Sequence, residues 1–200
     1  MITISIIVLT VIISLWGFRD HSVFNRLCLY PYEMAAAGSG YFRFVSVGFV
    51  HADWGHLLFN MLTLWFFGSV LEQQVFSEVQ YVLLYFSAMV LSSAPEYRKQ
   101  QQNPGYRACG ASGAVSAVLF SLVLFQPWGV IYIKFIIPVY FVLFAVFYML
   151  YSWYQSRNAS DNIAHGVHLW GALYGIAYTL IVKPESFSIF LDKIRRPPFL

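Results

Sequence analysis

A serine flanked by glycines and a histidine further along the chain have the residue types that nucleophilic catalysis requires. Ser112 lies between Gly110 and Gly113, and His168 follows in a later apolar segment. A serine hydroxyl becomes a strong nucleophile at neutral pH when a base accepts its proton, and imidazole is the usual base. The glycines allow a tight turn and a close backbone approach. This pattern predicts Ser112 as nucleophile and His168 as general base.

Donors for an oxyanion are the second requirement, because the tetrahedral intermediate of such a reaction carries a negative oxygen. His56 and Asn60 are four residues apart, so in a helix they project from one face. The backbone N–H of Ser112, at the start of an apolar segment, is a third candidate. We therefore expect His56, Asn60 and the Ser112 N–H to form an oxyanion hole.

The composition places these residues in a lipid bilayer. Of the 200 residues, 59% are hydrophobic, 20% are aromatic and only 10% are charged, which is too apolar for a soluble domain of this length. The net charge of +3 is spread along the chain without a basic run among aromatic residues, so we expect no nucleic-acid partner. The expected protein is an integral, multi-pass membrane protein with one domain, residues 1–200. We also expect it in the inner membrane of a bacterium, a location that the composition itself does not distinguish from other membranes.

Apolar segments recur along the chain and predict an all-α fold, a bundle of six transmembrane helices. The first segment lacks a basic start and a small-residue cleavage site, so we interpret it as a retained helix. The aromatic-rich connection 19–55 is expected to pack at the membrane interface. The predicted helices are 2–18, 56–76, 79–95, 112–126, 130–152 and 162–182.

The candidate residues all lie near the starts of even-numbered helices, which cross the bilayer in the same direction. Ser112 precedes Pro127 by 15 residues, and His168 precedes Lys183 by 15. Both therefore lie about 22 Å above the far boundary of a hydrocarbon core about 30 Å thick. We expect the serine and the histidine to meet below the membrane surface.

Small residues on two of the helices predict a close contact between them. Gly113, Ala117 and Ser121 form a stripe on the fourth helix, and Gly171 and Gly175 form a GxxxG stripe on the sixth. Such stripes let helix backbones approach closely in membranes. The two helices that carry the predicted catalytic residues are therefore expected to touch.

Four ordered motifs give the sequence a resemblance to the rhomboid family. Residues 40–60 read GYFRFVSVGFVHADWGHLLFN and resemble its first-loop and second-helix signature, and residues 68–72 (GSVLE) resemble the end of that helix. Residues 110–113 (GASG) match its GxSG motif, and residues 168–175 (HLWGALYG) match its HxxGxxxG motif. The resemblance extends over about residues 40–180.

The resemblance implies an intramembrane serine protease that hydrolyses peptide bonds in or near transmembrane segments of membrane proteins. It assigns Ser112 and His168 as a catalytic dyad without a third acid, and His56 with Asn60 as oxyanion donors. It implies neither a metal nor a cofactor. The expected partners are transmembrane protein substrates and the lipid bilayer.

Supporting roles also follow from the resemblance. His51 and Arg43 are expected to brace the first loop, and Glu72 to hold the lower part of the bundle together. The sequence departs from the family pattern at two positions. Phe42 stands where a tryptophan often precedes the arginine, and Ser116 stands where an aromatic residue often stacks on the base. The second departure leaves open which group orients the histidine.

Rival functions are compatible with the same residues. A metal- or haem-binding membrane protein could use imidazole ligands, although it would not need the glycine-flanked serine. A channel or transporter also buries polar residues, but it would more often show internal repeats. A catalytically inactive relative could bind membrane proteins. The histidines available to a metal or haem are His51, His56, His165 and His168.

Several other residues receive less specific interpretations. Cys28 and Cys109 are far apart in sequence and form no CxxC pair, so we interpret them as packing residues rather than a disulfide. His165 lies about 60° round the helix from His168 and nearer the surface. It could be a ligand, a proton relay or an interfacial histidine, and we favour the last. Aromatic residues of the fifth predicted helix are expected to face lipid or the core surface, and the family resemblance implies that this helix could move to admit substrate. They include Phe141, Phe144, Phe147 and Tyr148.

Overall fold

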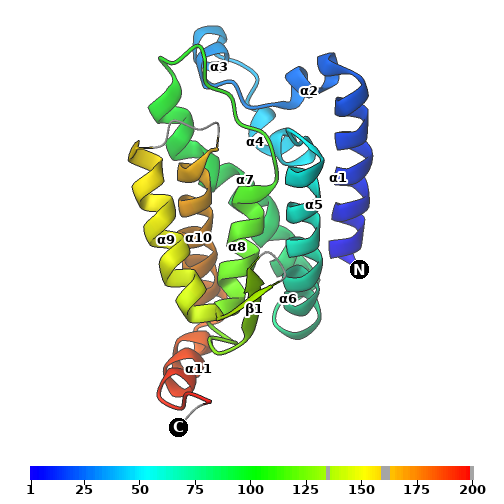
Figure 1. Cartoon of the computed structure of the whole chain (residues 1–200). Coiled ribbons are helices and arrows are strands. Elements are labelled where there is room, and N and C mark those ends of the chain that lie inside the picture. Colours follow the sequence, from blue (N-terminus) through cyan, green and yellow to red (C-terminus); the bar gives the residue numbers. More distant parts are fainter. Residues whose placement is uncertain (134–135, 159–162, 199–200) are drawn as a thin grey trace.

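In the computed structural model, most of the chain forms long helices that lie side by side (Figure 1). The structure describes residues 1–133, 136–158 and 163–198. Helix α5 continues through a π-helical turn, η2, into α6, so these elements form one rod. The long elements are α1 (Ile2–Arg19), α5 (Trp54–Thr63), η2 (Leu64–Gly68), α6 (Ser69–Gln74), α7 (Glu78–Gln100), α8 (Ser112–Val123), α9 (Phe141–Asn158) and α10 (His165–Val182).

The connection between α1 and α5 folds at one end of the bundle (Figure 1). It contains α2 (His21–Leu27), α3 (Pro31–Ala37), α4 (Arg43–Ser46) and the 3-10 turn η1 (Val47–Phe49). Asp20 caps α2 by accepting the Ser22 backbone N–H at 2.8 Å. The connection after α7 lies at the same end, where Leu29 and Ala108 pair as an antiparallel bridge. The two loops therefore form one layer above the helices.

The structure corrects the predicted helix 130–152 over its first residues. Strands β1 (Val130–Ile133) and β2 (Ile137–Tyr140) form an antiparallel hairpin, and α9 begins only at Phe141. The physical reason is local. Pro138 lacks an N–H and would clash in a helix interior, and the surrounding run is rich in β-branched residues that favour strands.

Smaller differences concern the ends of the predicted helices. The fourth helix ends at Val123 rather than at residue 126, and the sixth begins at His165, while residue 162 lies outside the described residues. A further helix, α11 (Glu185–Ile194), follows Pro184 and was not predicted. Proline suits a helix start because it cannot donate the N–H that the first turn leaves unpaired anyway.

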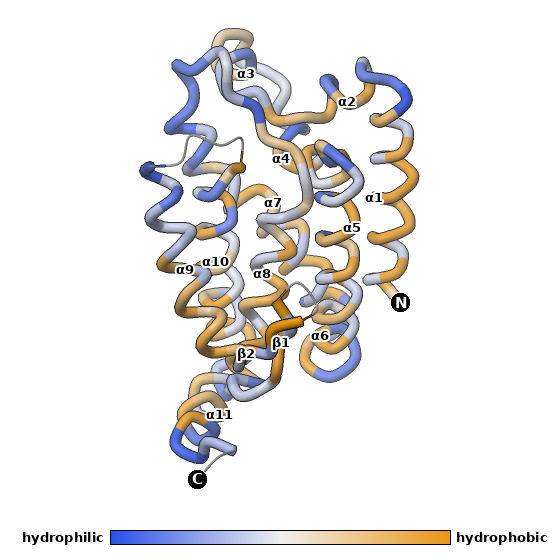
Figure 2. Tube along the Cα trace, viewed as in Figure 1, coloured by the Kyte–Doolittle hydropathy of each residue, from blue (hydrophilic) through white to orange (hydrophobic). Residues whose placement is uncertain are grey.

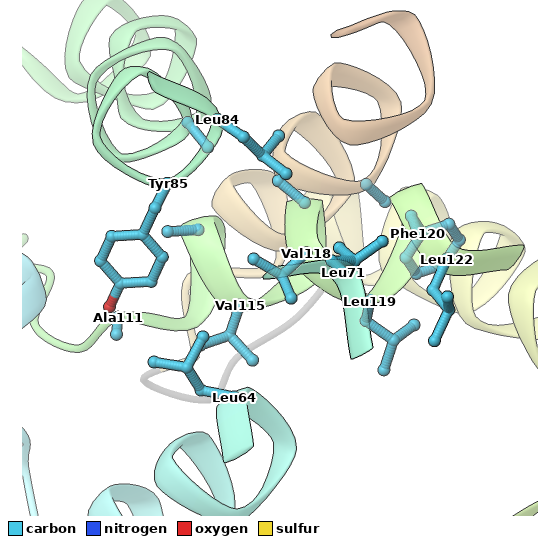
Figure 3. Packing of buried hydrophobic residues seen from close by; sticks show 14 of the residues in the cluster. Leu64, Leu71, Leu84, Tyr85, Ala111, Val115, Val118, Leu119, Phe120 and Leu122 are labelled. Atoms are coloured by element: carbon cyan, nitrogen blue, oxygen red, sulfur yellow. The ribbon is translucent and has the colours of Figure 1, made fainter. Parts of the chain in front are cut away.

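Helix α8 forms the centre of the core. Each of its residues from Gly113 to Val123 is buried. Figure 3 shows its side chains, among them Val115 and Val118, packed between Leu64 of η2 and Leu84 of α7. A helix that is apolar all round is expected at such a central position. The start of α8, which carries Ser112, is therefore held from several sides.

The outer helices present apolar side chains outward. Ile12 of α1 is 59% exposed and Phe147 of α9 is 67% exposed. Figure 2 shows hydrophobic residues along the middle of the bundle and hydrophilic residues gathered towards its ends. Among the described residues, Ile2–Arg19 and Trp54–Gln74 combine the length of a membrane span with mean hydropathies of 2.1 and 1.3. The predicted number of six spans stays a prediction.

Close contact between α8 and α10 depends on glycine. A Cβ atom at Gly171 would collide with the carbonyl oxygen of Gly113, and one at Gly175 with that of Ala117. The Ser121 hydroxyl donates to the Gly175 carbonyl at 3.1 Å. The two helices thus touch along their small-residue stripes, which sets the distance between the side chains at their starts.

Candidate active site

The turn before α8 places Ser112 at the first position of this helix. Gly110 has φ 108°, a conformation that disfavours any side chain. A Cβ atom there would also lie 2.5 Å from the His56 ring. The Gly110 N–H donates to the Val47 carbonyl at 3.0 Å, which fixes the turn against the first connection. Gly110 is therefore required both for the backbone conformation and for the approach of His56.

Ser112 and His168 form the central contact of the site. The Nε2 atom of His168 lies 2.7 Å from the Oγ atom of Ser112. Both residues are half-buried, and they lie at the starts of the touching helices α8 and α10. When the hydroxyl donates in this hydrogen bond, Nε2 is the acceptor and can take the proton. The geometry is that of a nucleophile with its base.

Tyr148 of α9 stacks on the imidazole of His168, with the ring centroids 6.4 Å apart and the planes inclined by 25°. Its hydroxyl lies 3.1 Å from the Ser116 hydroxyl. The aromatic ring that the sequence lacks at position 116 is therefore supplied by another helix. Sequence reasoning missed this role because Tyr148 stood within an aromatic run that resembled a lipid-facing surface. The sequence offered no signal that singles it out, because Tyr151 and Tyr154 lie on the same helix.

Asn60 and His56 lie on α5 beside the serine. The Asn60 Nδ2 group donates one hydrogen to the His56 carbonyl at 2.8 Å, which leaves a second amide hydrogen for another acceptor. A cavity of about 180 Å³ adjoins Ser112 and has Asn60, Thr63, Phe144 and Tyr148 among its lining residues. An oxyanion formed in this cavity has amide and hydroxyl groups around it.

His51 links the active-site turn to the first helix. Its Nε2 atom accepts the Ala111 N–H at 3.3 Å, and its Nδ1 atom lies 3.0 Å from the Ser14 hydroxyl. Burial, with the neighbouring His56, lowers the pKa of His51 to about 3, so the ring is neutral. Since Nε2 accepts, Nδ1 carries the proton and donates to Ser14, which in turn donates to the Phe49 carbonyl at 2.9 Å. Every group in this chain has a partner.

The remaining predicted supporting residues lie away from the reacting atoms. Arg43 forms an ion pair with Glu33 at 3.3 Å and lies over the Tyr30 ring, 5.2 Å from its centroid, within the first connection. Glu72 accepts the backbone N–H groups of Ile2 at 2.5 Å and Thr3 at 2.9 Å. This carboxylate thus occupies the N-terminus of α1, where negative charge is favourable.

His165 is buried rather than exposed at an interface, with 4% of its surface accessible. Its ring is edge-on to Tyr151 at 5.5 Å and to His168 at 6.2 Å between centroids. The His165 ring therefore lies next to the His168 ring. Over the ranges that the structure describes, no three or more His, Cys, Asp or Glu side chains are grouped as metal ligands.

These features define a class of protein: a helical bundle with apolar outer faces that carries a serine–histidine pair at the starts of two touching helices. A comparison with protein families identifies the family. The chain belongs to the rhomboid family, because the Rhomboid domain model matches residues 38–185. The resemblance inferred from the four sequence motifs is confirmed.

Curated relatives come from plants and bacteria. The chain is 28% identical over 159 residues to RHOMBOID-like protein 12, mitochondrial, of Arabidopsis thaliana. The matched region covers 70% of this chain and 46% of that protein. It is 26% identical over 155 residues to Rhomboid protease GlpG of Klebsiella pneumoniae, 76% of this chain and 52% of that protein. It is 27% identical over 142 residues to Rhomboid protease GlpG of Salmonella paratyphi A, 70% of this chain and 48% of that protein.

The chain spans about half the length of the curated relatives it matches. Membership of the family makes it a membrane-integral protein. The relatives include a mitochondrial protein as well as bacterial ones, so the bacterial inner membrane stays a prediction.

Proposed function

We propose that this protein is an intramembrane serine protease that cleaves transmembrane protein substrates through an acyl-enzyme on Ser112. The observation that carries the proposal is the 2.7 Å contact between Ser112 Oγ and His168 Nε2. The hydroxyl attacks the substrate carbonyl carbon while His168 accepts its proton. The imidazolium then gives this proton to the leaving amine, and water hydrolyses the ester in the same manner.

The oxyanion is proposed to be held by His56, the free amide hydrogen of Asn60 and the Ser112 N–H. Support comes from the position of Asn60 in the wall of the cavity beside Ser112. Such donors stabilise charge that develops only in the transition state, so they contribute mainly to turnover. The GlpG relatives, which are named as rhomboid proteases, support the reaction class.

The substrate is proposed to be a transmembrane segment with helix-weakening residues near the cut. Peptide bonds in an intact helix are internally hydrogen-bonded and shielded from the serine, and Gly or Pro eases local unwinding. Cleavage should be measured for a substrate segment and for a version in which every Gly and Pro is replaced by Leu. Equal cleavage of both segments would contradict this part of the proposal.

The nucleophile is tested by labelling the detergent-solubilised protein with a fluorophosphonate, which reacts with activated serines. We expect labelling of the wild type and none of Ser112→Ala or His168→Ala. Absence of labelling in the wild type would favour a catalytically inactive membrane-protein-binding relative. Stoichiometric zinc or iron whose removal abolishes activity would favour the histidine-ligand alternative instead.

A further inference from the structure

Cys28 and Cys109 face each other at the layer of loops above the active site, although they are far apart in the sequence. Both thiols are free. Leu29 and Ala108 exchange both backbone hydrogen bonds, each at 3.0 Å. Continued by one residue, this antiparallel register would set Cys28 opposite Cys109 as a non-hydrogen-bonded pair, and Cys109 does pack against the cluster that contains Cys28. Both cysteines are free packing residues, as the sequence predicted, but their proximity to each other was not expected.

This register has the dimensions of a disulfide. Opposed residues in a non-hydrogen-bonded antiparallel pair have Cα atoms about 4.5 Å apart, within the range of about 4.4–6.8 Å that disulfides span. Cys28 has extended backbone angles, φ −64° and ψ 153°, as the pairing requires. Cys109 packs against the buried apolar cluster that contains Cys28. Bond formation thus needs only a small approach of the sulfur atoms.

The two thiols differ in reactivity. Cys28 is fully buried, whereas Cys109 is half-buried. The neighbouring Cys28 thiol, opposed by burial and reinforced by His56 and Arg107, lowers the pKa of Cys109 to about 5. The neighbouring Cys109, together with burial, raises the pKa of Cys28. Cys109 is the accessible attacking thiol, and Cys28 is the partner that completes the bond.

Cys109 is joined directly to the active-site turn. Gly110 lies against the His56 ring, and the Ala111 N–H is held by His51. The neighbouring His56 side chain also lowers the pKa of the Cys109 thiol. A disulfide would remove the thiolate beside His56 and pull the start of the turn toward the first connection. Both changes act on groups next to Ser112.

We propose that Cys28 and Cys109 form a reversible dithiol–disulfide site whose oxidation lowers turnover at Ser112. The Cys109 thiolate attacks a small-molecule disulfide such as oxidised glutathione and releases one thiolate. Cys28 then loses its proton and attacks the Cys109 sulfur of the mixed disulfide, which releases the second thiolate. Two protein thiols lose two hydrogens, and the oxidant becomes two molecules of thiol; a dithiol reductant reverses the step.

Disulfide formation is independent of the proposed function, whereas the effect on turnover rests on it. The test treats the detergent-solubilised full chain with oxidised glutathione, blocks free thiols with a maleimide under denaturing conditions and measures the intact mass. We expect the wild type to lose two hydrogens and both maleimide sites, and dithiothreitol to restore them. In Cys28→Ser, we expect glutathione to remain attached to Cys109. Failure of the intramolecular bond to form would overturn the proposal.

Turnover of a transmembrane substrate is measured on the same samples. Oxidation should lower it about tenfold, less than the roughly 100-fold cost of a 1 Å misplacement. The matched control, Cys28→Ser/Cys109→Ser, should cleave equally with and without oxidant. A disulfide that leaves turnover unchanged overturns the regulatory role. If the reduced wild type neither cleaves nor labels, the proposed function and the regulatory role fail together, and the mass measurement alone decides whether the dithiol site exists.

Discussion

Replacing Tyr148 tests whether the ring that stacks on His168 orients the base. Tyr148→Leu removes the stack, whose centroid separation is 6.4 Å, while the site keeps an apolar side chain. An aromatic stack of this kind contributes about 0.5–1.5 kcal/mol, and 1.36 kcal/mol corresponds to tenfold in rate. If the whole of this energy orients the base, the substitution lowers the rate of acylation about twofold to twelvefold.

Two variants separate the stack from other roles of Tyr148. Tyr148→Phe keeps the ring, so it should retain most of the turnover and lose about 1 kcal/mol of stability, because the buried Ser116 hydroxyl loses its partner. Phe147→Leu changes an exposed neighbour on the same helix and should change neither quantity. Thermal unfolding of each variant shows whether the bundle remains folded.

The assay is the rate of fluorophosphonate labelling together with kcat and KM for a transmembrane substrate. Tyr148 also lines the cavity beside Ser112, so loss of substrate contacts alone would raise KM. A small fluorophosphonate does not depend on those contacts. A folded Tyr148→Leu protein that is labelled at the wild-type rate would refute the orienting role.

The remaining predictions concern the base, the oxyanion hole and the reactive thiol. His168→Ala should abolish labelling and cleavage while His165→Ala keeps a substantial fraction of both, since His168 contacts the Ser112 hydroxyl. The reverse pattern would overturn the assignment of the base. Asn60→Ala should lower turnover about 100- to 1,000-fold with the fold intact by circular dichroism, and unchanged cleavage would make the residue structural only. Iodoacetamide should alkylate Cys109 above a pH of about 5 and lose reactivity below it, where the thiolate becomes protonated, because Cys28 and other neighbours lower its pKa to about 5. A midpoint near the ordinary value of 9.0 in a pH titration of alkylation would contradict this arrangement.

The contact between Ser112 and His168 could be predicted from the sequence because it depends on regular helices. Equal spacing to the ends of the two segments set both residues at one depth, and the glycine stripes indicated which helix faces touch. In the structure, the carbonyl of Gly113 fills the space that a side chain at Gly171 would need. Helix periodicity is therefore sufficient to predict that these two side chains meet.

The parts that sequence reasoning missed depend on features without a simple period. The hairpin at residues 130–140 was hidden in a continuous apolar run, where hydropathy alone does not distinguish strand from helix. Tyr148 of α9 stacks on His168 of α10, and the sequence does not indicate which of the several aromatic rings of α9 makes this contact. The opposition of Cys28 and Cys109 arises from pairing between two loops, which no local pattern encodes.

The hydrogen-bond chain through His51 affects where this protein can be divided. The Rhomboid domain match begins at residue 38, which would leave α1 outside a minimal fragment. Such a fragment would lack the Ser14 hydroxyl, so the His51 Nδ1–H and the Phe49 carbonyl would lose their partners. An unsatisfied buried polar group costs about 1–3 kcal/mol, and this cost would fall on the histidine that holds the Ala111 N–H. A fragment cut at the family boundary is therefore expected to be less stable around His51 than the chain that keeps α1.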